Sequence, residues 1–287
     1  LDDLYDCNDG DLVAKYSLDE TNPSEVDDGV WCNDLPGDVE GAATVAGVWG
    51  NGLDFDGTND YVKVDDTGSL DISAGISISA WVNLDDNESR SYIVNKWTSD
   101  TGYRFQIGSD GKLEFKYDDS VCNSVTVLEE NKWYLVTATM VSGNSKIYIN
   151  DNVDKTCTSS DTSITSNSLD FWIGSGSSSE HFIDGTIDDV ALWSNALTSS
   201  EIEKIYWGGD FVKPVVNASA GDFAFKLSAS EAELKYFEVQ YSGSDSSDVG
   251  VLVTADEVKV YDVLSRYNKY AFKVSSADEV ELRYLSM

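Results

Sequence analysis

The sequence predicts an all-β protein built from two β-sandwiches, a larger one over residues 1–209 and a smaller one over residues 210–287. Apolar and polar residues alternate with a period of two through most of the chain, which is typical of strands that bury one face. Clusters of Gly, Asn, Asp and Ser separate these runs and indicate turns. The pattern restarts after Gly209, where residues 211–214 lead into a second series of short runs.

The strands of the larger part follow from this alternation. They are expected over residues 12–18, 76–84, 103–107, 113–117 and 147–149. Residues 108–111 and 142–145 lie between such runs and are rich in Gly, Ser, Asp and Asn. These residues tolerate the positive φ that tight turns require, so we expect hairpins at both places.

One segment near the end of the larger part has a helical pattern. Thr198 is followed three residues later by Glu201, which is the spacing of a capping box. Ile202, Ile205 and Tyr206 then recur at helical spacing, and glycines follow at 208 and 209. The spacing predicts one short helix that closes the larger sandwich.

The smaller part contains five to seven short apolar runs in about 75 residues, which matches the number of strands in a small immunoglobulin-like or fibronectin-III-like sandwich. No Cys or Trp occurs from Lys213 to the end of the chain. We therefore expect a second, all-β domain without a disulfide.

The charge of the chain excludes some partners. Its 52 acidic and 19 basic residues give a formal net charge of −33, so binding to nucleic acid or to an anionic membrane is not expected. Cations are the natural partners, although a solvated acidic surface that keeps the protein soluble would have the same composition. No apolar stretch approaches the length of a membrane span.

The four cysteines favour an oxidising environment. None of Cys7, Cys32, Cys122 and Cys157 lies in a C-x-x-C pair, and His181 is the only histidine, so zinc and redox sites have little support. Of the three connectivities, we favour Cys7–Cys32 with Cys122–Cys157 because these pairs join neighbouring segments; free buried cysteines are the alternative. The chain begins at Leu1 rather than Met, which we interpret as an exported chain without its signal.

Several sequence blocks resemble the laminin-G-like, concanavalin-A-like lectin and glucanase family in their order and spacing. They are residues 52–57 with 60–62, 76–82, 133–138, 146–150, and 184–190 with 196–202. The resemblance covers residues from about 10 to 207 and implies a jelly-roll sandwich. It says little about activity, because lectins, adhesive modules and glycosidases share this architecture.

The resemblance also implies a structural calcium site. Family members often hold Ca²⁺ with carboxylates at positions that match Asp19, Asp54, Asp56, Asp60 and Asp188 of this sequence. A hard cation takes six to eight oxygen ligands, which carboxylates in sharp turns can supply together with backbone carbonyls. The alternative is that these residues only form turns and caps. The apolar alternation shifts between Ile187 and Val190, so Asp188 or Asp189 is expected at a bulge or facing inward.

The tryptophans divide into two groups. Trp81, Trp133, Trp172 and Trp193 lie in or beside expected strands and are assigned to core packing. Trp31, Trp49 and Trp97 lie nearer to loops, where they are candidates for contacts with sugar rings, although core packing remains the simpler interpretation.

No catalytic motif supports an enzyme. Glycosidases of this architecture use two carboxylates on one strand in a Glu-x-Asp-x-x-Glu-like pattern, which the sequence lacks, and no nucleophile motif surrounds His181. Three hypotheses follow: a structural subunit of an extracellular homopolymer, a secreted carbohydrate-binding or adhesion module with a glycan or cell-surface ligand, and a glycoside hydrolase with an unrecognised site. The two-domain all-β build and the acidic segment over residues 1–11 favour the homopolymer. Repulsion between highly charged subunits opposes it.

Overall fold

The structure is a computed structural model that describes residues 11–20, 24–26 and 35–207, together with the strands of the C-terminal part. The chain divides into two compact units, Leu1–Tyr206 and Trp207–Met287. Cys7, Cys32 and Trp31 lie outside the described residues, and so do residues 1–10 of the N-terminal segment. The predictions for them are therefore not addressed by the structure.

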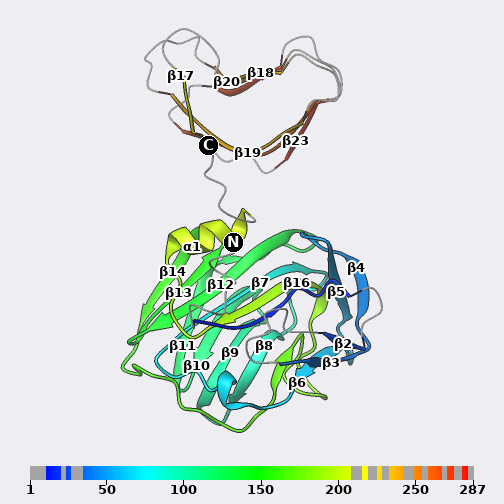
Figure 1. The fold of residues 1–287 in the computed structure, drawn as a ribbon, viewed down its shortest axis with the longest axis vertical. Helices are drawn as coiled ribbons and strands as arrows, with labels where there is room; N and C mark the ends of the chain where they lie inside the picture. Colours follow the sequence, from blue (N-terminus) through cyan, green and yellow to red (C-terminus); the bar gives the residue numbers. More distant parts are fainter. Residues whose placement is uncertain are drawn as a thin grey trace. The chain divides into compact units, whose positions relative to one another are not determined.

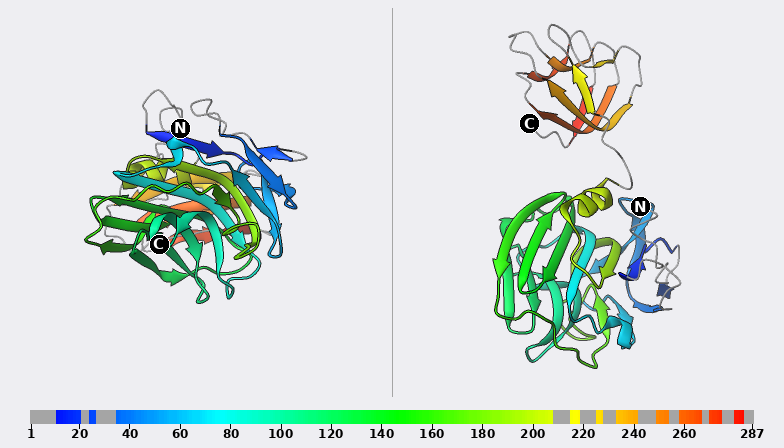
Figure 2. Two further views of the ribbon diagram at one scale, coloured as in Figure 1. Left: turned by 90° about the horizontal axis from the view of Figure 1, so that it is seen from below. Right: turned by 60° about the vertical axis from the view of Figure 1, so that its left-hand side comes forward.

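The first unit is a jelly-roll sandwich of two antiparallel sheets (Figure 1; Figure 2). Among the described residues each sheet has eight strands. Sheet A runs β14 (Asn152–Thr158), β13 (Asn144–Ile149), β12 (Trp133–Val141), β7 (Gly75–Leu84), β16 (Asp184–Trp193), β5 (Asn51–Asp56) and β4 (Ala43–Ala46), with β1 (Leu12–Tyr16) also paired to β16. Sheet B runs β11 (Ser120–Val127), β10 (Lys112–Tyr117), β9 (Thr101–Ile107), β8 (Ser91–Thr98), β15 (Phe171–Ile173), β6 (Tyr61–Val64), β3 (Gly37–Glu40) and β2 (Glu25–Val26).

Two apolar clusters hold the jelly roll together. The larger lies between the sheets and includes Phe105, Phe115 and Ile187, none of them more than 1 % exposed. The smaller lies on the outer side of sheet A, where Trp81 and Trp193 pack beneath helix α1 (Ser199–Tyr206). A short 3-10 turn, η2 (Gly68–Leu70), adds a buried leucine to the larger cluster. The all-β fold predicted from the alternation is confirmed.

The predicted turns and helix are also confirmed. Ser142 and Gly143 both have positive φ and connect β12 to β13, which are paired antiparallel. At the start of α1 the backbone N–H of Thr198 donates to Glu201 Oε2 at 2.6 Å, and the N–H of Glu201 donates to Thr198 Oγ1 at 3.3 Å. This reciprocal capping box satisfies two N–H groups at the helix start.

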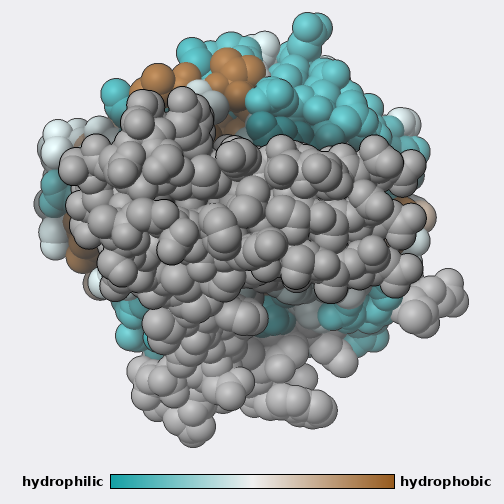
Figure 3. Space-filling model, turned by 90° about the horizontal axis from the view of Figure 1, so that it is seen from above, coloured by the Kyte–Doolittle hydropathy of each residue, from teal (hydrophilic) through white to brown (hydrophobic). Residues whose placement is uncertain are grey.

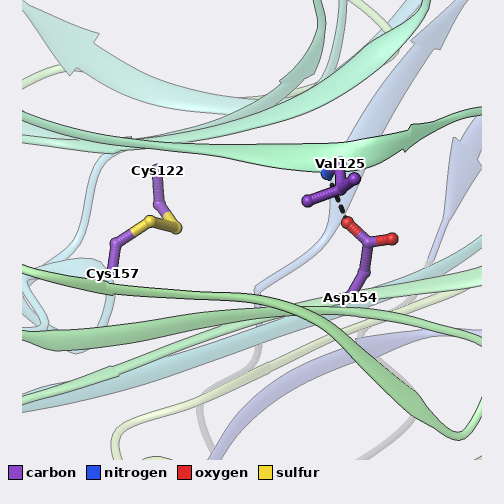
Figure 4. Close-up of a disulfide and its surroundings, with 4 residues drawn as sticks. All are labelled: Cys122, Val125, Asp154 and Cys157. Atoms are coloured by element: carbon purple, nitrogen blue, oxygen red, sulfur yellow. Dashed lines mark hydrogen bonds between the residues drawn. A yellow bond between two sulfur atoms is a disulfide. The ribbon is translucent and has the colours of Figure 1, made fainter.

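A disulfide joins the two sheets at one corner of the sandwich. Cys122 on β11 and Cys157 on β14 form it, with a Cα–Cα distance of 5.8 Å, as the sequence-local pairing predicts. Three residues further along β11, the N–H of Val125 donates to the carboxylate of Asp154 on β14 at 2.5 Å (Figure 4). The two edge strands therefore run antiparallel to each other, and the Asp154 carboxylate accepts N–H groups that have no partner strand on that side.

The second unit consists of parallel strands. One sheet contains β17 (Val215–Ala218), β19 (Glu233–Tyr241), β21 (Val258–Arg266) and β23 (Val280–Arg283), and the other contains β18 (Phe225–Leu227), β20 (Val249–Val253) and β22 (Tyr270–Val274). Every recorded pairing in both sheets is parallel. Immunoglobulin and fibronectin-III sandwiches are antiparallel, so the structure does not confirm that assignment. The strands alternate between the two sheets along the chain, so a strand of the other sheet lies in each crossover between adjacent parallel strands.

The visible surface of the jelly roll is mostly hydrophilic, with small hydrophobic areas between the polar ones (Figure 3). The described residues contain no helix with the length and hydrophobicity needed to span a bilayer.

Candidate functional site

The outer face of sheet B carries an unusual group of aromatic and polar side chains. Tyr103, Phe105 and Ile107 on β9 are buried between the sheets, so the alternating residues Arg104 and Gln106 point to the outer side. The same alternation points neighbouring side chains of β6, β10 and β15 outward, and on β8 a bulge follows Tyr92, so that Ile93 and Val94 are both buried in the core. We call this set the aromatic face: Tyr61, Lys63, Tyr92, Asn95, Trp97, Arg104, Gln106, Glu114, Lys116 and Trp172.

Strand register brings these residues into rows. Lys63 on β6 is opposite Trp172 on β15, Trp172 is opposite Asn95 on β8, Asn95 is opposite Arg104 on β9, and Arg104 is opposite Lys116 on β10. Directly opposite residues have Cβ atoms about 5 Å apart, so this row continues across five strands. A shorter row, Tyr92 to Gln106 to Glu114, lies beside it.

Two of the aromatic rings form a half-buried pair on this face. Trp172 and Tyr61 meet edge to face, with ring centroids 5.1 Å apart and planes at 70°. Trp172 belongs to neither apolar cluster. The sequence assigned it to core packing, because alternation within a strand of three residues does not tell which face of the sheet is buried.

A second aromatic group surrounds Arg104. Its guanidinium carbon lies 4.3 Å from the centre of the Trp97 ring and 5.1 Å from that of Tyr92. The Lys116 ammonium also lies over Trp97, at 4.0 Å, and His181 stacks on Tyr92 at 4.8 Å. Trp97 therefore has two cationic side chains over its indole ring. A sugar that packs on Trp97 would compete with them for the face of that ring.

Three polar side chains of the aromatic face are almost fully buried and incompletely paired. Asn95, Arg104 and Gln106, which we call the polar trio, are 5 %, 7 % and 0 % exposed. Asn95 Oδ1, Arg104 Nε and Gln106 Oε1 are buried and make no hydrogen bond. Buried polar atoms are rarely left unpaired, so this cluster indicates a place where water or a ligand completes the hydrogen bonding.

The predicted metal residues fall into two separate groups, of which the first contains Asp188 and Asp19. Strand β16 has a bulge between Asp188 and Ala191, as the shift in alternation predicts, and Asp188 is fully buried. Its Oδ2 accepts hydrogen bonds from the N–H groups of Val48 at 2.7 Å and Trp49 at 3.2 Å, whereas Oδ1 is buried without a partner. Burial, followed by repulsion from Asp189, raises the pKa of Asp188 to about 7.

The second group contains Asp54, Asp56 and Asp60 at the other end of β5. Asp60 Oδ2 accepts from the Asp56 N–H at 3.0 Å, and Asp56 Oδ1 accepts from the Thr58 N–H at 2.8 Å. Burial, with repulsion from Asp56 and Asp54, raises the pKa of Asp60 above its usual value. Within the described ranges, no three His, Cys, Asp or Glu side chains gather closely enough to form a metal site. The five predicted ligands are thus not brought to one point.

The remaining loop tryptophan, Trp49, is half-buried and packs against the smaller apolar cluster. Its backbone N–H donates a hydrogen bond to Asp188 Oδ2. Of the two described candidates for sugar contacts, Trp97 therefore lies on the aromatic face and Trp49 packs beside sheet A.

Comparison with known proteins gives the following matches. The family model described as the concanavalin A-like lectin/glucanases superfamily, of the laminin-G type, matches residues 56–203. A search of curated protein sequences gave no match. Domain 4 of AbnA, an extracellular GH43 arabinanase from Geobacillus stearothermophilus solved in complex with arabinotriose, is 20 % identical, with a TM-score of 0.56 over 68 % of this chain and 98 % of that domain.

Two toxin binding domains have similar folds. The binding domain of Paraclostridial Mosquitocidal Protein 1 is 18 % identical (TM-score 0.56, 71 % of this chain), and that of botulinum neurotoxin serotype D is 16 % identical (TM-score 0.55, 72 % of this chain). The chain spans about half of each, 52 % and 54 %. At these identities the matches establish a shared fold.

Proposed function

The chain belongs to the concanavalin A-like lectin/glucanases superfamily, and from that premise we propose that its jelly roll is a non-catalytic module that binds carbohydrate on the aromatic face. The observation that carries the proposal is the half-buried Trp172–Tyr61 pair beside the incompletely paired polar trio. Binding sites for small ligands combine apolar rings with a few convergent polar groups. The arabinotriose complex of the AbnA domain supports a carbohydrate-binding role, because it shows a domain of similar fold with an oligosaccharide bound.

The proposal predicts that Trp172→Ala lowers affinity for the bound glycan about tenfold or more, because it removes the ring surface against which a sugar packs. A glycan array followed by calorimetry on the strongest binder measures this. Trp133→Ala is the matched control, since Trp133 is a half-buried tryptophan that packs on the outer side of sheet A. Equal affinity of the wild type and Trp172→Ala would exclude the aromatic face as the site.

We also propose that a calcium ion binds beside Asp188 and Asp19. The buried, unpartnered Asp188 Oδ1 fits a cation, and Asp19 is a nearby negative charge that raises the pKa of Asp188 further. Asp19 and Asp188 would supply carboxylate oxygens, with backbone carbonyls or water completing the coordination. The ion would neutralise a carboxylate whose burial is otherwise costly.

An extracellular location is part of the same proposal. The Cys122–Cys157 disulfide supports it, because disulfides persist in oxidising compartments and are rare in the cytosol.

Self-assembly is a second candidate, and one feature of the C-terminal unit favours it. β17 and β23 are the first and last strands of one parallel sheet, and each has a partner on only one side among the described strands. Exposed strand edges can pair with another chain, and a head-to-tail contact that does not close into a ring generates a filament.

We expect particles much larger than the 31.4 kDa chain by light scattering in calcium-containing buffer. A monodisperse 31.4 kDa particle would remove this candidate.

A further inference from the structure

The polar trio of the aromatic face has a defined pattern of donors and acceptors. The amide nitrogen of Asn95 donates to the carbonyl of Gly176 at 2.8 Å, and that of Gln106 donates to Glu114 Oε1 at 2.9 Å. Because a carbonyl and a carboxylate accept hydrogen bonds, these contacts fix which end of each amide is the nitrogen. The unpartnered atoms of both side chains are therefore oxygens that accept hydrogen bonds.

Arg104 adds one donor to these two acceptors. Its terminal nitrogens are used, Nη1 by the Tyr92 hydroxyl at 3.0 Å and Nη2 by Glu114 Oε1 at 3.3 Å. Its Nε–H is buried without a partner. A hydroxyl group both donates and accepts, so hydroxyls match all three atoms. A carboxylate or sulfate only accepts, so it matches Arg104 Nε and is opposed by the two amide oxygens.

The cations of the face already have anionic neighbours. Lys63 contacts Asp65 at 2.5 Å and Asp170 at 3.4 Å, Arg104 contacts Glu114, and Lys116 lies 3.9 Å from Asp100. An incoming anion would have to compete with these carboxylates, in a chain whose net charge is −33. The long-range field therefore opposes anionic ligands as well.

We propose that the aromatic face selects neutral, hydroxyl-rich saccharides and rejects saccharides that carry carboxylate or sulfate groups. This inference rests on the proposed carbohydrate-binding function and names its ligand class. The unpartnered atoms of the trio are buried in the free protein, so their pairing with saccharide hydroxyls requires the side chains over them to move when the sugar ring contacts Trp172. The selection comes from unpaired acceptors, since a carboxylate or sulfate placed at the trio leaves both amide oxygens unsatisfied, whereas a hydroxyl there donates to them.

The test is an array of immobilised neutral, uronic-acid, sialylated and sulfated glycans of matched length, probed with the full chain at low and at physiological salt. We expect the bound glycans to be neutral, with affinity at least tenfold above that for their acidic counterparts at both salt concentrations. Acidic glycans that bind as tightly, or that gain affinity at low salt, would overturn this inference and leave the carbohydrate-binding function standing. A folded protein that binds no glycan of any class would overturn the function itself.

A variant separates ligand selection from folding. Gln106→Met removes one unpartnered oxygen and the Gln106 Nε2–Glu114 Oε1 hydrogen bond at nearly constant length, and it leaves the Asn95 contact to Gly176 in place. We expect its affinity for the best neutral glycan to fall about tenfold, with little change in Tm, because losing a buried unpaired oxygen offsets losing the hydrogen bond to Glu114, which still accepts from Arg104. Asn83→Leu is the matched control, since Asn83 Oδ1 is a buried, unpartnered amide oxygen on sheet A. Unchanged binding by Gln106→Met, or an equal loss in Asn83→Leu, would contradict the role of the trio.

Discussion

Replacing Lys96 by methionine is expected to lower the free energy of unfolding of the jelly roll by at least about 3 kcal/mol, the range found when one partner of a buried ion pair is removed. The Lys96 side chain is only 2 % exposed. Its ammonium donates to Asp66 Oδ1 at 2.5 Å and to the backbone carbonyls of Asn167 and Leu169 at 3.2 and 2.6 Å. Methionine fills a similar volume and supplies none of these donors.

The large effect follows from what Lys96 connects. It lies on β8 and holds two connecting segments, one after β6 and one before β15, against the end of the sandwich. Without the ammonium, two backbone carbonyls lose a partner, and each unsatisfied buried group costs about 1 to 3 kcal/mol. The segment before β15 leads directly to Trp172, so loosening it should also weaken glycan binding.

Urea unfolding followed by tryptophan fluorescence measures this change. Lys132→Met is the matched control, because the Lys132–Glu129 ion pair is on the surface, with side chains 36 % and 72 % exposed. Such pairs contribute about 0 to 1 kcal/mol. If Lys96→Met lost no more stability than Lys132→Met, Lys96 would not be a structural anchor.

The second large effect is a fall in stability as the pH rises, caused by Asp188. Its pKa is about 7 in the folded protein and has its ordinary value near 4 in the unfolded chain. The folded state therefore binds the proton more tightly, and the favourable contribution of the protonated carboxyl is fully present below about pH 4 and lost as the pH rises through 7. The full loss is on the order of 4 kcal/mol, since the pKa rises from 3.8 to about 7 and one pKa unit corresponds to about 1.4 kcal/mol.

Unfolding in chelator between about pH 5 and 8 measures this slope. Asp188→Asn keeps an oxygen for the N–H groups of Val48 and Trp49 and cannot ionise, so the part of the fall in stability that comes from Asp188 should be absent in this variant. Calcium should restore much of the stability of the wild type near pH 8, because an ion that binds only the folded state stabilises it by mass action. A wild-type profile that is flat in chelator would show that Asp188 does not titrate as its burial implies. An unchanged Tm with and without calcium would remove the ion from the proposal.

Much of the fold could be predicted from patterns that are local in the sequence. The alternation of apolar residues predicts the strands, and the Thr198–Glu201 spacing predicts α1 with its reciprocal cap. The change of alternation after Ile187 predicts the bulge beside Asp188. The Cys122–Cys157 pair was also found from sequence, although three connectivities were open. The strands, the helix cap and the bulge share one cause: they depend on backbone conformation and side-chain chemistry within a few residues, whereas the disulfide joins cysteines 35 residues apart.

The sites depended on tertiary structure. Asp188 and Asp19 lie apart from Asp54, Asp56 and Asp60, and alternation alone did not show that Trp172 turns to the outer side of sheet B. Parallel pairing in the C-terminal unit was likewise not evident from its short apolar runs. The polar trio exists only because register places residues of β8 and β9 side by side. Alternation with a period of two indicates that a strand has two different faces. The packing of distant strands decides which face is covered and which residues it contacts.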